Sequence, residues 1–111
     1  MLRLGTREEA KMFARVTSIA GAPDRAEEGI RNFQEQVLPA ARQLAGFKGA
    51  YLLMDRATGD ALAVTIWESD EAMQASEEAA SELRAGAAKE VGATAAPTVS
   101  RYEVVVSEPP Q

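Results

Sequence analysis

A chain of 111 residues, 46% of them hydrophobic and 26% charged, has room for one hydrophobic core and the composition of an ordinary globular domain. Its net charge of −5 and its lack of basic runs argue against nucleic acid or anionic membrane as partners, and no apolar run is long enough to span a bilayer. Cysteine and histidine are both absent, which excludes disulfides, thiol nucleophiles, Ser-His-Asp triads and histidine-ligated haem or iron.

The first eleven residues are polar and show no hydrophobic periodicity, so we predict that residues 1–11 form a flexible extension. This segment is charged and has no apolar signal sequence, and the expected location is therefore the cytoplasm. Residues 12–20 are rich in β-branched and aromatic types and stop at Gly21. That pattern predicts the first strand.

The next pattern is that of a helix with one apolar stripe. Pro23 suits a first helical turn, and the acidic residues that follow favour a helix N-terminus. Pro39 interrupts the hydrogen-bond ladder, so we expect a kink there, and Gly46 is placed to end the helix. The stripe consists of Ala26, Ile30, Phe33, Val37, Ala41 and Leu44, at steps of three or four.

A β-hairpin is predicted next, because the apolar runs 50–54 and 61–67 flank a polar loop that contains glycine. Either Ser69 or Asp70 can cap a second helix that ends at Gly92, with a buried side made mostly of alanine. Its acidic residues, Glu77, Glu78 and Glu82 among them, are expected on the solvated face rather than in a metal site.

Residues 99–106 predict the last strand, and residues 108–111 form a short tail. The resulting order, β-α-β-β-α-β, predicts an α+β ferredoxin-like domain over residues 12–107, with an antiparallel four-stranded sheet and two helices on one face. The strands 51–54 and 61–67 are apolar at nearly every position, so both faces of the sheet need cover. We predict a homodimer packed through the open face; the alternative is that short buried strands are uniformly apolar in any small domain.

Two stretches carry a resemblance to a known family. They are Leu-Ala-Gly-Phe-Lys-Gly at 44–49 and Trp-Glu-Ser-Asp-Glu-Ala-Met at 67–73. With the element order, they make residues 12 to about 106 similar to the antibiotic biosynthesis monooxygenase family. The resemblance implies a dimeric α+β barrel. Members of the family include cofactor-independent oxygenases of quinols and anthrones, haem-degrading enzymes, and proteins with no known activity.

Only one family site residue carries over directly. Trp67 matches the strand tryptophan that lines the pocket between sheet and helices in the haem-degrading and anthrone-oxidising members. The family asparagine falls at Val16 or Ala63, and the family histidine falls near Ser76. The resemblance therefore argues against haem degradation of the family type.

Cofactor-free oxygenation needs a group that removes a proton and donors that hold the resulting anion. Trp67 suits a pocket wall, although a buried tryptophan is also common in a core. The strand residues Arg15 and Arg101 face a pocket, a solvated or salt-bridged sheet edge, or the dimer interface. The tyrosines are either ligand contacts or structural. The predicted pocket residues are Trp67, Tyr51, Arg15, Tyr102 and Ser76.

Two functions remain open at this point. The first is a cofactor-independent monooxygenase of an aromatic, quinol-like metabolite, and the second is a non-catalytic dimer that binds a small hydrophobic ligand or serves as an accessory protein. We expect neither a metal nor a cofactor in either case. A solvent-reachable cavity beside Trp67 with an ionisable group inside favours catalysis, whereas a site filled by apolar side chains favours the second function.

Overall fold

The computed structural model describes residues 11–90, 93 and 95–108. Most of the predicted N-terminal extension, the predicted helix end at Gly92 and the last residues of the tail lie outside these ranges. The described strands all fall where the sequence predicts them, with ends that differ by up to three residues. They are β1 (Met12–Ile19), β2 (Phe47–Met54), β3 (Ala61–Trp67) and β4 (Thr98–Val104).

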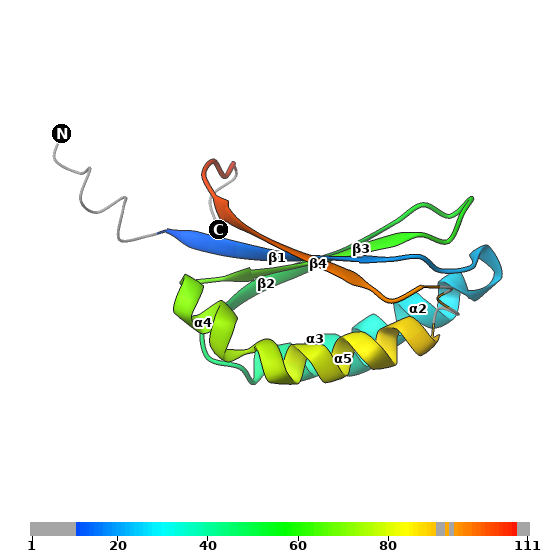
Figure 1. Ribbon diagram of the computed structural model, residues 1–111, viewed down its shortest axis with the longest axis horizontal. Helices are drawn as coiled ribbons and strands as arrows, with labels where there is room; N and C mark the ends of the chain where they lie inside the picture. Colours follow the sequence, from blue (N-terminus) through cyan, green and yellow to red (C-terminus); the bar gives the residue numbers. More distant parts are fainter. Residues whose placement is uncertain (1–10, 91–92, 94, 109–111) are drawn as a thin grey trace, which may run out of the picture.

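The four strands form one antiparallel sheet in the order β2-β3-β1-β4. The helical segments all lie on the same side of this sheet, and the other side is left open (Figure 1). The predicted ferredoxin-like α+β fold is therefore confirmed. β1 is an inner strand that pairs with both β3 and β4, so its side chains lie at the centre of each face.

The first helical segment is continuous but not uniform. It begins with a 3₁₀ turn η1 (Pro23–Arg25), continues as α2 (Ala26–Asn32) and a π-helical turn η2 (Phe33–Val37), and ends as α3 (Leu38–Arg42). Pro39 has no N–H and its ring would collide with the carbonyl four residues earlier, so the wide turn just before it accommodates the ring. The irregularity that we expected at Pro39 takes this form.

The second helical segment corrects the prediction of one uninterrupted helix. It consists of α4 (Asp70–Ala75) and α5 (Glu77–Glu90), with a break at Ser76. Ser69 caps the start as expected, because its Oγ accepts a hydrogen bond of 3.0 Å from the N–H of Ala72. At the break, the Oγ of Ser76 donates to the carbonyl of Met73 at 2.7 Å, a local bond that competes with the helical ladder.

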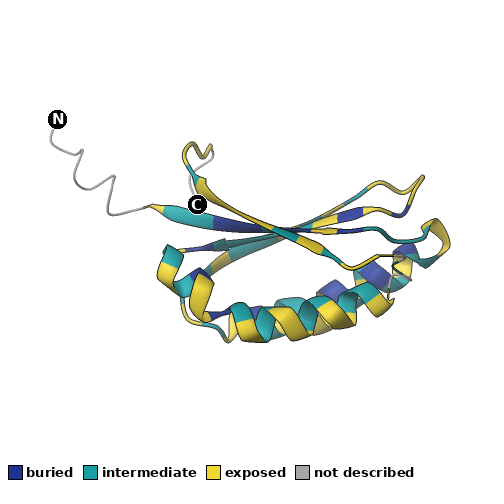
Figure 2. Cartoon of the chain, viewed as in Figure 1, coloured by how far each residue is buried: buried dark blue, intermediate teal, exposed yellow. Residues whose placement is uncertain are grey.

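Cross-strand partners point to the same face of a sheet, so the register assigns each strand residue to a side. Arg15 pairs with Thr65 and Arg101, and these three positions face the helices. The residues that alternate with these positions along each strand face the open side, and the edge strand β4 is largely exposed (Figure 2). The large exposed hydrophobic residues on that side are Tyr51, Leu53, Leu62 and Tyr102.

Two glycines fix the connections around the site. Gly46 has φ of 84° after α3, in the left-handed region that the predicted helix end requires, and its carbonyl accepts from the N–H of Glu68 at 2.8 Å. Gly59 has φ of 83° in the hairpin loop, which packs against the backbone at Ala22. None of the helices in the described ranges is both long and apolar enough to cross a membrane.

Candidate functional site

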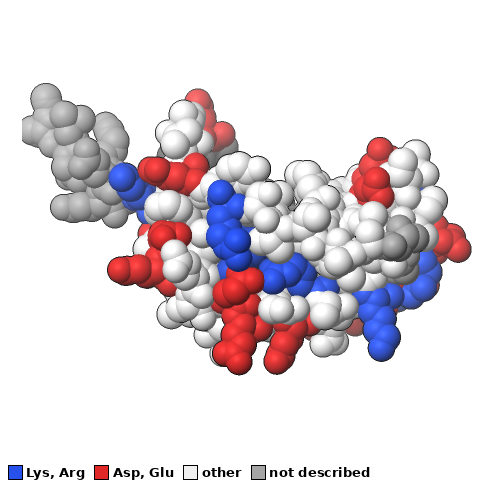
Figure 3. Space-filling model, in the orientation of Figure 1, with Lys and Arg blue, Asp and Glu red and all other residues white. Residues whose placement is uncertain are grey.

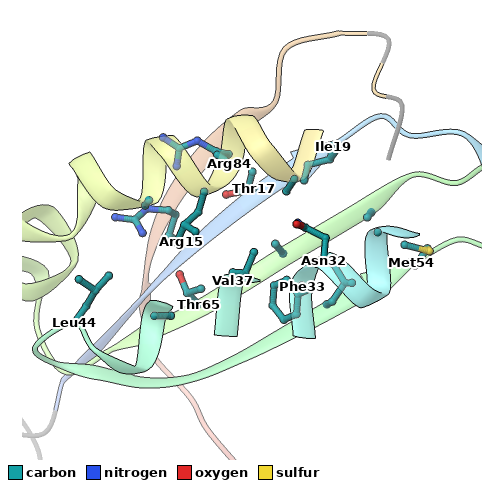
Figure 4. A pocket seen from close by; sticks show the side chains of 18 of the residues that line it. Arg15, Thr17, Ile19, Asn32, Phe33, Val37, Leu44, Met54, Thr65 and Arg84 are labelled. Atoms are coloured by element: carbon teal, nitrogen blue, oxygen red, sulfur yellow. The ribbon is translucent and has the colours of Figure 1, made fainter. Parts of the chain in front are cut away.

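A cavity lies between the sheet and the helices. Its interior volume is about 70 Å³, and it is partly open to solvent. Figure 4 shows Arg15 and Arg84 close together toward one end, with Ile19 and Met54 toward the other. Most of the lining is apolar, and Arg15 and Arg84 are the charged residues among the lining positions. The cavity is therefore chemically polarised, with a basic end and an apolar body.

Arg15 is placed at this basic end by the register of β1, which turns odd-numbered side chains toward the helices. Its side chain is only 3% exposed. Its Nη2 donates to the carbonyl of Met73 at 2.7 Å and to the Oγ of Ser76 at 2.9 Å. The break between α4 and α5 thus supplies the oxygens that hold a guanidinium in the interior, where an unpaired charge would be costly.

One carboxylate joins three guanidinium groups beside the cavity. Glu77 Oε1 lies 3.1 Å from Nη2 of Arg15 and 2.9 Å from Nη2 of Arg101, and its Oε2 lies 2.7 Å from Nη2 of Arg84. We call these four residues the Glu77 cluster. Basic and acidic side chains touch on the flank of the molecule between the sheet and α5 (Figure 3). Glu77 is not part of a merely solvated face, which corrects the prediction for that residue.

Burial and charge act in opposite directions within the Glu77 cluster. Burial lowers the pKa of Arg15, whereas the charge of Glu77 raises it, and the net shift is downward. Burial alone raises the pKa of Glu77, but hydrogen bonds from Arg84 and Arg101 and the charge of Arg15 outweigh it and lower the pKa overall. Glu77 is therefore ionised at neutral pH and is a poor general base.

Trp67 forms the wall of the cavity next to Arg15. It is 1% exposed and meets the ring of Phe47 edge-on, with the ring centres 5.6 Å apart. Its Nε1 donates to Oγ1 of Thr65 at 2.9 Å, and the guanidinium carbon of Arg15 lies 5.5 Å from the centre of its ring. The indole N–H is therefore used within the protein, while the Thr65 hydroxyl, which also lines the cavity, has its own proton to donate.

The structure brings together three of the five residues predicted for the pocket. Trp67 and Arg15 line the cavity, and Ser76 supports Arg15 through a hydrogen bond. Tyr51 and Tyr102 lie on the opposite face of the sheet, 53% and 57% exposed, and line no part of this cavity. Their position follows from the pleat, since neighbouring strand residues point to opposite sides.

Several residues that matter here were not singled out from the sequence. Arg84 follows Ala80 by one helical step of four, a spacing that places it beside the alanine stripe. Thr65 is the polar residue in the otherwise apolar strand β3, a pattern that can be recognised from the sequence. Asn32 lines both the cavity and a shallow polar groove on the surface between the two helical segments, so it stands where the cavity approaches solvent.

A prediction about pH follows from Glu77. A carboxyl whose pKa is lowered by folding stabilises the folded state above its unfolded pKa, about 4.3, and that contribution is lost as the pH falls through the lower folded value. We expect Glu77→Gln to unfold at a lower temperature than the wild type at pH 7, with a gap that narrows as the pH falls below about 4.3. Calorimetry at a series of pH values measures this, with Glu78→Gln as the control for a lost charge. A difference in unfolding temperature between the wild type and Glu77→Gln that stays constant down to pH 3 contradicts the prediction.

The fold and the cavity together define a small α+β domain with a mostly apolar cavity between its sheet and its helices. The chain belongs to the antibiotic biosynthesis monooxygenase family, whose model matches residues 12–81. An uncharacterized Mycobacterium tuberculosis protein, Rv2557, is 34% identical over 93 residues. This alignment covers 84% of the chain but only 41% of Rv2557, so the chain spans about two fifths of that relative's length.

Two solved structures share the fold. A monooxygenase of Streptomyces coelicolor, solved with the ligand nanaomycin D, has a TM-score of 0.71 at 18% identity and covers 94% of this chain and 96% of its own. The haem-degrader MhuD of M. tuberculosis, solved with two haems in its active site, has a TM-score of 0.66 at 30% identity and covers 86% of this chain and 97% of its own.

The residues around the cavity do not fit histidine-ligated haem. The chain contains no histidine or cysteine, and Met54 is the one thioether among the lining residues. Ser76, near the position that the resemblance gives to the family histidine, is buried, with its Oγ engaged by Met73 and Arg15. We therefore derive no step through haem.

Proposed function

We propose that this protein oxidises a small aromatic, quinol-like or anthrone-like metabolite with molecular oxygen, without a cofactor, in the cavity beside Trp67. The observation that carries the proposal is a buried guanidinium, that of Arg15, set against an indole face in a cavity with a largely apolar lining. The apolar body suits a flat aromatic ligand, and the basic end suits the anion formed when such a ligand loses a proton. Family membership and the monooxygenase of shared fold support the same reaction class.

The chemistry needs no base from the cavity lining, whose described residues include no carboxylate. A positive charge nearby lowers the pKa of a phenol or an activated CH₂ group, so water can take the proton. The carbanion or phenolate then gives electrons to O₂. For an anthrone, the CH₂ carbon loses two hydrogens and gains one oxygen atom as a carbonyl, and the second oxygen atom leaves in water. Arg15 and the Thr65 hydroxyl hold the developing anion.

A second candidate, non-catalytic binding of a small hydrophobic ligand, is favoured by one observation. The positions aligned with the family asparagine are Val16, on the open side of the sheet, and Ala63, which lines the cavity without a polar group. Binding without turnover uses the same cavity and the same Trp67 wall.

Oxygen uptake together with thermal stabilisation separates the two functions. Anthrone and 1,4-dihydroxynaphthalene are added to the wild type and to Trp67→Phe and Arg15→Lys, with autoxidation without protein subtracted. Stabilisation with uptake of one O₂ per anthrone, weakened in both variants and unchanged in Tyr102→Phe on the opposite face, supports the oxygenase. Stabilisation without uptake supports the binding protein, and no stabilisation by any aromatic compound overturns both.

We also propose that two copies pair through the open face of the sheet, as the sequence predicts. The exposed side chains of Tyr51, Leu53 and Leu62 form part of an apolar surface on strands β2 and β3, and a two-fold axis would bury it in both copies.

The dimer yields a direct prediction. Leu62→Glu places a charge on the proposed interface twice, once from each copy, and we expect monomers with native circular dichroism. Sedimentation velocity measures the change, with Gln34→Glu adding the same charge on the exposed helical side as the control. A Leu62→Glu variant that sediments with the wild type as a dimer, or a wild type that is monomeric at high concentration, contradicts the proposal.

A further inference from the structure

The Glu77 cluster is unbalanced in charge. Three guanidinium groups surround a single carboxylate, so the cluster carries two more positive than negative charges. Arg15 and Arg84 extend from the cluster into the lining of the cavity, while Arg101 is the more exposed member at the surface. A cavity with such an end attracts anions, because opposite charges interact more strongly where water is excluded.

Arg15 also has unused hydrogen-bonding capacity. Its contacts with Met73, Ser76 and Glu77 all involve Nη2. Its Nε is buried and has no hydrogen-bond partner among the described residues. Since an unsatisfied buried donor is costly and arginine binds carboxylates through two parallel hydrogen bonds, this group is matched to a carboxylate.

From these observations, and resting on the cavity being the ligand site proposed above, we propose that Arg15 and Arg84 form an anion subsite. It takes the carboxylate of an aromatic acid whose ring system fills the apolar part of the cavity. Glu77 occupies this subsite in the free protein and is displaced by the ligand. A carboxylated aromatic is therefore bound more tightly than a neutral aromatic with the same ring system.

Displacement of Glu77 is feasible for this geometry. Its side chain is 36% exposed and lies at the first residue of α5, directly after the break at Ser76, so it has solvent on one side. Arg101, at the surface, remains as its partner when Arg15 and Arg84 turn to the ligand. The ligand carboxylate then takes the place of the Glu77 carboxylate beside Arg15 and Arg84. The net charge at this end of the cavity is therefore unchanged.

Calorimetric titration with 2-naphthoate and with 2-naphthamide, a neutral compound of nearly the same shape, tests the subsite. We expect the wild type to bind the acid about tenfold more tightly than the amide, the size of one charge-assisted hydrogen bond. Glu77→Gln removes the competing carboxylate, and we expect about tenfold tighter binding of the acid with little change for the amide. Arg84→Gln is expected to abolish the preference, and Arg56→Gln, a charge-matched change in an exposed ion pair, to keep it.

The outcomes separate this inference from the function on which it rests. Equal binding of acid and amide overturns the anion subsite and leaves the aromatic cavity intact. A preference for the acid that neither Glu77→Gln nor Arg84→Gln alters places the acid elsewhere and also overturns it. Binding of neither compound overturns both the subsite and the proposed ligand site. Arg84→Gln keeps the test decisive if Glu77→Gln fails to fold.

Discussion

Trp67→Ala is expected to lower the free energy of unfolding by about 3 to 5 kcal/mol, the range for removing a large aromatic side chain from a core. The indole is 1% exposed, packs edge-on against Phe47 and donates a hydrogen bond to Thr65. Truncation also leaves the guanidinium of Arg15 without the aromatic surface beside it. Several contacts are thus lost at once, and the space they occupied joins an existing cavity that has little tendency to collapse.

Urea unfolding followed by far-ultraviolet circular dichroism measures this loss, because the variant has no tryptophan fluorescence to follow. Trp67→Phe is the matched control: it keeps an aromatic ring and loses the hydrogen bond, so we expect a cost of about 1 to 2 kcal/mol. An alanine variant as stable as the phenylalanine variant would show that the ring contributes no packing energy and serves the ligand alone.

Gly59→Ala is expected to destabilise the protein by more than about 2 kcal/mol. The backbone at Gly59 has φ of 83°, which costs an L-residue about 1 to 2 kcal/mol. In addition, a Cβ there would clash with the carbonyl carbon of Ala22 and lie 2.6 Å from the nitrogen of Pro23. Both neighbours are backbone atoms, so the clash is relieved only by moving the hairpin loop away from the start of the first helical segment.

Gly86→Ala is expected to have the opposite effect and to stabilise the protein. Gly86 lies in α5 with nothing within 4 Å of its Cβ position, so alanine should raise the unfolding free energy by about 0.5 to 1 kcal/mol. Thermal unfolding of both variants against the wild type measures the contrast. A Gly59→Ala variant as stable as the wild type would contradict the account of Gly59, and a destabilised Gly86→Ala variant would contradict that of Gly86.

The elements were predictable because helix and strand periodicities are local. The break between α4 and α5 at Ser76 could not be predicted in this way. The hydrogen bond that Ser76 accepts from Arg15 joins residues 61 positions apart in the sequence. The basic end of the cavity was hidden for the same reason: Glu77 reads as one acidic residue among several until the fold brings Arg15, Arg84 and Arg101 to it.

The side of the sheet to which Tyr51 and Tyr102 point was harder to predict than the strands themselves. Tyr51 faces the open side because a bulge between Phe47 and Gly49 shifts the register of β2 against β3, and a one-residue shift reverses the side to which every later residue points. The side to which Tyr102 points could be predicted from its neighbour in the sequence. It follows Arg101 directly in a strand, so the two cannot both face the helices.

The helix α5 is fourteen residues long and lines the cavity with part of one face, yet none of its residues is buried. Little apolar surface therefore has to be exposed for this helix to detach, and native-state opening should begin there rather than in the sheet. Backbone amide hydrogen exchange would then report α5 as the least protected helix in the free protein. The helix α5 is thus the part of the cavity lining that detaches most easily. A ligand that binds beneath α5 and holds it in place would slow amide exchange along the whole helix.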